Sequence, residues 1–148
     1  PSLDYVREHG VHQFLTQYKR LKDVEPPTFL WGDEVEYEIF KKNKNGNFDL
    51  SLRADEVRKE LTAKEETEWS HLPKEQRCNW QPEYGSWMIE IVPEAPYSGY
   101  INDLIQLEEA HRLRRQRLHF ALKDNEIAPS VSNFPINYKN LSKYGGLN

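Results

Sequence analysis

Apolar residues recur along the chain with two different periods. Between Ser2 and about Lys22 they return mostly every three or four residues, which predicts an amphipathic helix with Ser2 as its N-cap. The same spacing predicts a short helix from Ala54 to about Ala63, and a longer helix from its N-cap Asp103 to about Lys123. The charged stretch 64–77 has no such period, and we expect it to be a mobile surface loop.

Strict alternation of apolar and polar residues marks the strands. Asn45-Gly46 suits a tight turn between two alternating runs, so residues 29–53 are predicted to form a β-hairpin. A later strand is expected to be interrupted by Pro82 and Gly85. The expected strands cover residues 28–41, 48–53, 80–92 and 130–135. The fold class is therefore α+β, an antiparallel β-sheet with flanking helices.

Length and composition limit what this chain can be. Its 148 residues form one domain, 1–148, and hydrophobic residues make up 37%, which predicts a thin core. We therefore expect the domain to be a piece of a larger protein, whose other residues complete the core. The net charge of −4 argues against a general nucleic-acid or membrane-surface binder. A single cysteine, and no apolar run of membrane-spanning length, favour a cytoplasmic location.

Acidic residues gather in two of the expected strands. Glu34, Glu36 and Glu38 share one face of the first strand, which suits either a solvated face or a hard cation such as Mg²⁺. Glu83 and Glu90 are seven residues apart, so a regular strand would place them on opposite faces. A one-residue bulge at Gly85 would return both to one face; otherwise Glu83 is a loop residue and Glu90 an isolated charge.

Arg114 falls on the apolar stripe of the long helix. A buried arginine needs an anionic partner, either a structural carboxylate or a phosphate or carboxylate of a substrate. The helix spacing leaves both alternatives open.

Several separated motifs make the sequence recognisable. The chain resembles the amino-terminal part of the catalytic subunit of eukaryotic glutamate–cysteine ligases up to about Pro135. The resemblance depends on Trp31-Gly32-Asp33-Glu34-Val35-Glu36-Tyr37, on Pro82-Glu83-Tyr84-Gly85 with Met88 and Glu90, on Pro93 and Pro96-Tyr97, and more weakly on Val6 to Gly10, Gln13 to Leu15, Glu108 and Arg114-Arg115.

The resemblance implies a fold and a reaction. The fold is that of the glutamine synthetase-like ligases, of which this chain would form part. The reaction joins the γ-carboxylate of glutamate to the amine of cysteine with ATP, the first step of glutathione biosynthesis. The resemblance makes Glu34, Glu36, Glu83 and Glu90 the Mg²⁺ ligands, and it leaves Glu38 as a charge at the rim. Arg114, as a buried arginine that needs an anion, is the candidate for binding the ATP cofactor. The resemblance identifies no catalytic residue in this chain.

The same resemblance implies binding partners, and two alternative functions stay open beside it. The partners implied are glutamate, cysteine and ATP, the rest of the ligase polypeptide and a regulatory modifier subunit, with neither nucleic acid nor membrane. The family's substrate pockets lie beyond residue 148, so the chain alone is expected to be inactive. The run Phe134-Pro135-Ile136-Asn137-Tyr138 lacks an arginine and a glycine common in the family. The alternatives are a non-catalytic metal-binding or regulatory module with the same fold, and an interaction domain acting through the basic helix at 111–119.

Overall fold

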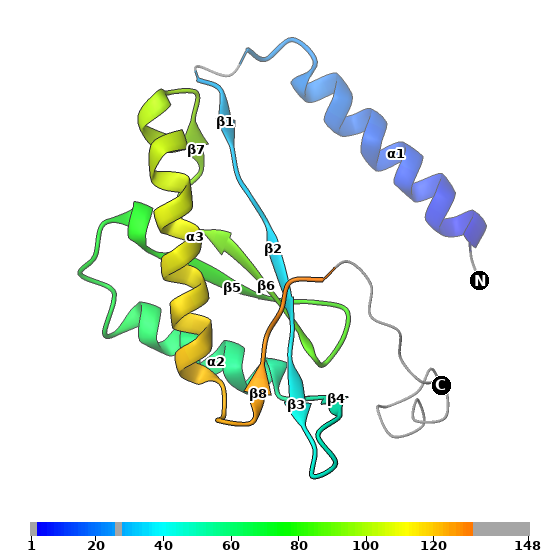
Figure 1. The fold of residues 1–148 in the computed structure, drawn as a ribbon. Coiled ribbons are helices and arrows are strands. Elements are labelled where there is room, and N and C mark those ends of the chain that lie inside the picture. The colour runs from blue at the N-terminus through cyan, green and yellow to red at the C-terminus, as the bar shows by residue number, and fades with distance from the viewer. Residues whose placement is uncertain (1–2, 26–27, 132–148) are drawn as a thin grey trace.

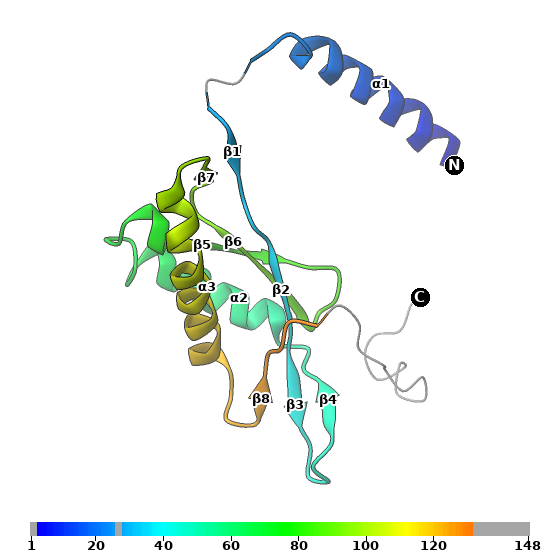
Figure 2. The same cartoon turned by 45° about the horizontal axis from the view of Figure 1, so that its top comes forward.

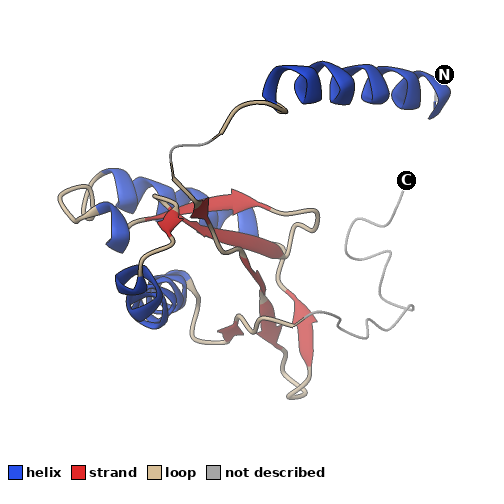
Figure 3. Ribbon diagram, turned by 90° about the horizontal axis from the view of Figure 1, so that it is seen from above, coloured by secondary structure: helices blue, strands red, loops and turns tan. Residues whose placement is uncertain are grey.

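The structure is a computed structural model, and it describes residues 3–25 and 28–131 (Figure 1). Its helices confirm the three that the spacing predicts, with changed ends. They are α1 (Leu3–Leu21), α2 (Ala54–Glu66) and α3 (Ile101–Ala121), together with a short 3-10 helix η1 (Lys74–Gln76). Figure 3 shows α1 apart from the other elements, and no residue of α1 is buried.

Eight short strands form three antiparallel sheets within the described residues. Their spatial orders are β1-β7, β2-β6-β5 and β4-β3-β8. The bounds are β1 (Leu30–Trp31), β2 (Val35–Glu38), β3 (Phe40–Lys42), β4 (Phe48–Leu50), β5 (Cys78–Pro82), β6 (Met88–Pro93), β7 (Tyr97–Ser98) and β8 (Glu126–Ile127).

Ile39 joins two of these sheets. In Figure 2, β2 continues into β3, which has β4 and β8 on its two sides. At the junction the Ile39 amide donates to the Trp87 carbonyl at 2.7 Å, while the Ile39 carbonyl accepts from Ser51 at 2.8 Å. The Ile39 side chain is fully buried. The acidic strand β2 therefore has its carboxyl end fixed in the core.

The hydrophobic core lies between sheet β2-β6-β5 and the two helices α2 and α3, which cross in Figure 1. Each element gives it the residues of one face, as the periods of helix and strand require. The fully buried members include Val57 and Leu61 from α2, Ile89 and Ile91 from β6, and Leu118 from α3.

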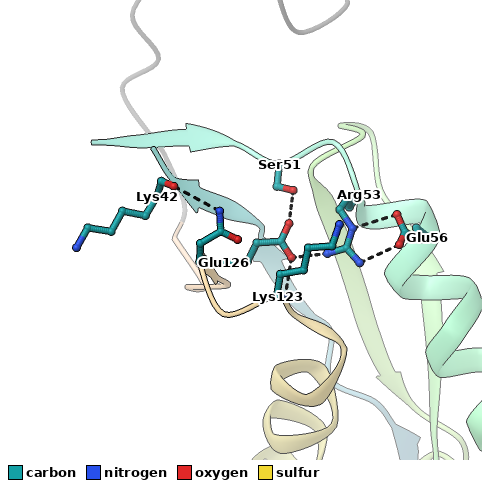
Figure 4. Close-up of polar contacts among 7 residues, drawn as sticks. Lys42, Ser51, Arg53, Glu56, Lys123 and Glu126 are labelled. Carbon is teal, nitrogen blue, oxygen red and sulfur yellow. Dashed lines mark hydrogen bonds and ion pairs between the residues drawn. The ribbon is translucent and has the colours of Figure 1, made fainter. Parts of the chain in front are cut away.

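A polar network ties β8 to the rest of the fold (Figure 4). Glu126 of β8 is 8% exposed. Its carboxylate accepts from Ser51 Oγ at 2.6 Å, from the Lys123 amide at 3.0 Å, and from Arg53. Arg53 also makes two hydrogen bonds to Glu56, of 2.9 and 3.0 Å. Because the buried carboxylate is fully paired, β8 can lie beside β3 without an unpaired charge.

Three sequence predictions about strands and turns need correction. The hairpin is only β3-β4, turning at Gly46 with φ +82°, because β2 pairs with β6 instead. Residues 80–92 are two antiparallel strands rather than one interrupted strand. Among the described residues the last strand is at 126–127, and residues 130 and 131 belong to no strand. The rest of the expected strand 130–135 lies outside the described residues, as does the expected cap Ser2.

The helix ends also differ from the prediction. α2 continues to Glu66, so the first residues of the expected loop 64–77 are helical, and the buried Glu65 shows that this turn faces the core. α3 begins at Ile101 rather than after Asp103. Asp103 instead accepts hydrogen bonds from the amide and hydroxyl of Ser98, at 2.6 and 2.5 Å. The mobility of the remaining loop stays a prediction.

Candidate metal centre

Glu36 and Glu90 face each other across two neighbouring strands. The antiparallel register of β2 and β6 pairs them directly. Side chains of directly opposite residues lie on the same face of the sheet, about 5 Å apart at Cβ. The fold thus brings together two carboxylates that are 54 positions apart in the chain.

Glu83 reaches the same place from β5. In the register, Gln81 of β5 lies opposite Glu90 and Pro82 opposite Ile89. Glu83 is two residues beyond Gln81 and therefore projects to the face of Glu90. The odd separation of Glu83 and Glu90 is resolved by a turn between two strands, not by the bulge at Gly85 that the sequence suggested.

The three carboxylates form one group. Glu36, Glu83 and Glu90 each offer an oxygen, and these oxygens lie within 4.8 Å of one another. Glu36 is exposed, and the other two are half-buried. Burial raises the pKa of Glu90, and the neighbouring carboxylates Glu34, Glu83 and Glu36 raise it further. The folded chain thus concentrates negative charge around Glu90.

Within the described part of the chain, no lysine, arginine or histidine forms an ion pair with any of these three glutamates. Like charges placed directly opposite each other on a sheet destabilise it. Two other carboxylates of this fold, Glu65 and Glu126, are instead paired with the arginines Arg117 and Arg53. A cation from solution would therefore stabilise this group.

Glu34 and Glu38 lie beside the group but outside it. Glu34 is exposed and is not among the residues whose oxygens gather, although its charge acts on Glu90. Glu38 was expected to be a rim charge, and this is wrong because it is 8% exposed and one of its oxygens is buried without a hydrogen-bond partner. Burial raises the pKa of Glu38, and the charge of Glu36 adds to this effect.

Arg114 lies 4% exposed on α3 and pairs with a carboxylate of the chain itself. Its Nη1 and Nη2 donate to the two oxygens of Asp33 at 2.7 and 3.1 Å, and Nη2 also donates to the Tyr97 hydroxyl at 2.8 Å. His111 Nε2 is 2.8 Å from Asp33. Burial acts to raise the pKa of Asp33, but the hydrogen bonds of Arg114 and Tyr97 and the charge of Arg114 outweigh it and lower that pKa.

The hydroxyl of Tyr97 belongs to this cluster as well. Burial and its hydrogen bond to Asp33 raise the pKa of Tyr97 to about 12. Asp33 is part of the motif at Trp31 to Tyr37, yet the sequence analysis predicted no role for it. The sequence does place Arg114 on an apolar stripe, and a buried arginine requires an anionic partner. The stripe does not identify which carboxylate that partner is.

A second buried ion pair was not foreseen from the sequence. Glu65 Oε1 accepts from Arg117 at 2.8 Å, from the Cys78 thiol at 2.9 Å and from the Trp80 indole at 3.3 Å. The Arg117 guanidinium also lies 4.2 Å from the ring centre of Trp69. Two of the four arginines between 111 and 119 are therefore buried, which does not favour the basic-helix interaction domain.

Comparison with known proteins gives a consistent family. The model of the glutamate-cysteine ligase family matches residues 1–143. The chain is 38% identical over 136 residues to a glutamate–cysteine ligase of Dictyostelium discoideum, covering 90% of this chain and 20% of the relative. It is 35% identical over 133 residues to the human glutamate–cysteine ligase catalytic subunit, covering 89% and 20%. The Candida albicans enzyme is 30% identical over 135 residues, covering 89% and 19%.

The chain spans about a fifth of the length of these curated relatives. In the described ranges 3–25 and 28–131, no helix combines the length and apolar character needed to cross a bilayer.

Proposed function

The chain belongs to the glutamate–cysteine ligase family, and we propose that its protein joins the γ-carboxylate of glutamate to the amine of cysteine with consumption of ATP. In this proposal Glu36, Glu83 and Glu90 hold Mg²⁺, Glu34 adds negative charge beside it, and the sheets form part of a glutamine synthetase-like fold. A cytoplasmic location and a modifier subunit belong to the same proposal.

The gathering of three carboxylate oxygens within 4.8 Å is the observation that carries the metal assignment. Mg²⁺ binds oxygen ligands at about 2.1 Å, so two oxygens on one ion lie at most about 4.2 Å apart. A small change of side-chain rotamer brings the group into that range. The donor set therefore fits Mg²⁺.

The proposed reaction with ATP explains why a metal ion is needed at this site. Bound Mg²⁺ would neutralise the polyphosphate of ATP and the glutamate carboxylate as these anions approach each other. The three glutamates leave the remaining coordination positions open for such oxygens because they all come from one face of the sheet.

Binding of the nucleotide by Arg114 stays a prediction. Its Nη atoms are used by Asp33 and Tyr97, and Nε donates to the Ala110 carbonyl at 3.2 Å. We therefore place the metal ligands, and not Arg114, at the centre of the proposal.

The products of the reaction test the ligase function. The protein encoded by the complete gene should form γ-glutamylcysteine from glutamate, cysteine and MgATP with release of ADP, and the absence of both products would contradict the ligase function. Metal binding without turnover would favour the alternative of a non-catalytic module.

Substitution tests the ligands one at a time. Glu36→Gln, Glu83→Gln and Glu90→Gln should each raise the Mg²⁺ requirement and lower kcat by a factor of about 10²–10³. Glu60→Gln is the matched control, because Glu60 is an exposed glutamate on α2, outside the group. Equal losses in the control would remove the metal assignment.

A further inference from the structure

Arg114 contacts three parts of the chain at once. The guanidinium extends from α3 to Asp33, which precedes β2, and to Tyr97 in β7. Both side chains of the ion pair are largely withdrawn from water, at 5% and 16% exposure for Arg114 and Asp33. A bidentate arginine–carboxylate pair fixes relative orientation as well as distance.

The ion pair holds the segment just before the acidic strand β2, where no strand pairing fixes the chain. Gly32, Asp33 and Glu34 belong to no sheet and connect β1 to β2. On their amino-terminal side, the Trp31 ring lies 4.8 Å from the Tyr97 ring, and the Trp31 indole donates to the Ser98 carbonyl at 2.9 Å. The next anchoring point is Asp33, which is held by Arg114 and lies three residues before the metal-ligand candidate Glu36.

Electrostatics supplies the reason for an anchor at this place. The carboxylates of Glu36, Glu83 and Glu90, with Glu34 beside them, repel one another, and a movement of β2 away from β6 would relieve part of this repulsion. A metal site tolerates displacements of only about 0.5 Å in its ligands. The ion pair between Arg114 and Asp33 opposes that movement without placing a cation among the ligands.

We propose that Arg114 is a positioning residue of the metal centre, acting through Asp33 to hold Glu34 and Glu36 against β6. This inference rests on the proposed metal site and extends it. It differs from nucleotide binding by Arg114, because the positioning role affects metal affinity when no nucleotide is present. Tyr97 is the third member, since its hydroxyl connects the same pair to β7.

The experiment measures binding of Mn²⁺ alone to the protein encoded by the complete gene by electron paramagnetic resonance, with the melting temperature of each variant recorded. Arg114→Lys keeps the charge but loses the bidentate contact, and Asp33→Asn keeps the shape but loses the charge. Each should weaken Mn²⁺ binding by a factor of about 10–100, the range found when an outer partner of a metal ligand is lost. The double variant should be no weaker than the worse single variant, because both remove one interaction.

Arg117→Lys is the matched control. Arg117 is also a buried arginine of α3, but its partner Glu65 packs against the beginning of β5 instead of β2. The control should lose thermal stability while its Mn²⁺ affinity stays within about twofold of the unsubstituted chain.

The outcomes separate the two proposals. An unsubstituted chain that binds no Mn²⁺ overturns the metal centre, and the positioning role with it. Binding that survives both Arg114→Lys and Asp33→Asn overturns the positioning role and leaves the metal centre in place. An equal loss in Arg117→Lys shows that lowered stability explains the effect, and it also overturns the positioning role.

Discussion

Burial determines the protonation of the Cys78 thiol. The Cys78 thiol is 2% exposed and donates to Glu65. Burial raises the pKa of the Cys78 thiol far above its ordinary value of 9.0, and the hydrogen bond and charge of Glu65 raise it further, against a smaller opposite effect of Arg117. The folded chain therefore holds this thiol protonated and unreactive.

This protonation gives the stability a dependence on alkaline pH. Above about pH 9 the unfolded chain releases the thiol proton while the folded chain retains it, so the free energy of unfolding should fall as the pH rises. One proton accounts for at most about 1.4 kcal/mol per pH unit. Cys78→Ser keeps a donor for Glu65 and does not titrate there. Denaturant unfolding of both chains between pH 8 and 10.5 checks the prediction, and parallel pH profiles would contradict it.

The sequence could predict the types of these residues but not their partners. The alternation around Glu36 indicated a carboxylate face, and the spacing around Arg114 indicated a buried cation that needs an anion. The anion, Asp33, is 81 positions away and is selected only by tertiary packing. Glu65 was assigned to a loop, because a run of charged residues offers no period from which burial of one member could be deduced.

At the scale of elements, the turn between β5 and β6 positions Glu83. Gly85 is buried in this turn, and its carbonyl accepts from the Met88 amide at 2.9 Å. A Cβ on Gly85 would lie 2.7 and 2.8 Å from two carbons of the Trp87 indole. Any side chain larger than that of glycine would therefore force the Trp87 ring to move.

Gly85→Ala should displace Trp87 and destabilise the chain by about 1–3 kcal/mol, the usual range for overpacking. Because Glu83 is in the same turn, Mn²⁺ binding should weaken as well. Gly99→Ala is the control, since its added Cβ would meet Phe29 at an ordinary 3.7 Å. Chemical unfolding and Mn²⁺ titration of the two variants test this expectation, and equal behaviour of the two would refute it.

The attachment of β8 depends on one carboxylate. Glu126→Gln removes the charge that faces Arg53, and the side chain of Glu126 is only 2% exposed. We expect a loss of about 1–3 kcal/mol in the free energy of unfolding, because the amide nitrogen of glutamine cannot accept the hydrogen bonds that a buried carboxylate oxygen accepts at this position. Glu56→Gln removes the other carboxylate of Arg53, which is 64% exposed, and should have little effect. Urea titration distinguishes the two, and a small loss in Glu126→Gln would show that β8 is held by other contacts.

Local periods predict elements well where the contacts that form them are close in sequence, and they fail where strand pairing is distant. The helices α1 and α3 and the hairpin β3-β4 follow from spacing and from the Asn-Gly turn. The partner of β2 does not follow from spacing. Two adjacent alternating runs predict a local hairpin, whereas β2 pairs with β6 about 55 residues later.

At the scale of the whole molecule, the apolar residues serve two separate surfaces. One set, from α2, α3 and the central sheet, forms the core. The other set lies along α1, where Val11 and Phe14 are 59% and 66% exposed. The thin core expected from composition is consistent with this division, because no residue of α1 is buried and its apolar residues contribute nothing to the core.

The two surfaces should respond differently to substitution. Val11→Gln and Phe14→Gln replace exposed apolar groups by glutamine, which is a good helix former, so the free energy of unfolding should change by no more than about 0.5 kcal/mol. Leu61→Ala and Leu118→Ala each empty a fully buried position and should cost about 2–5 kcal/mol. Denaturant unfolding followed by tryptophan fluorescence measures all four, because Trp80 lies in the core beside these leucines. A loss of several kcal/mol in the α1 variants would mean that α1 packs onto the core in solution, and the stability of this domain would then have to be divided between the two surfaces.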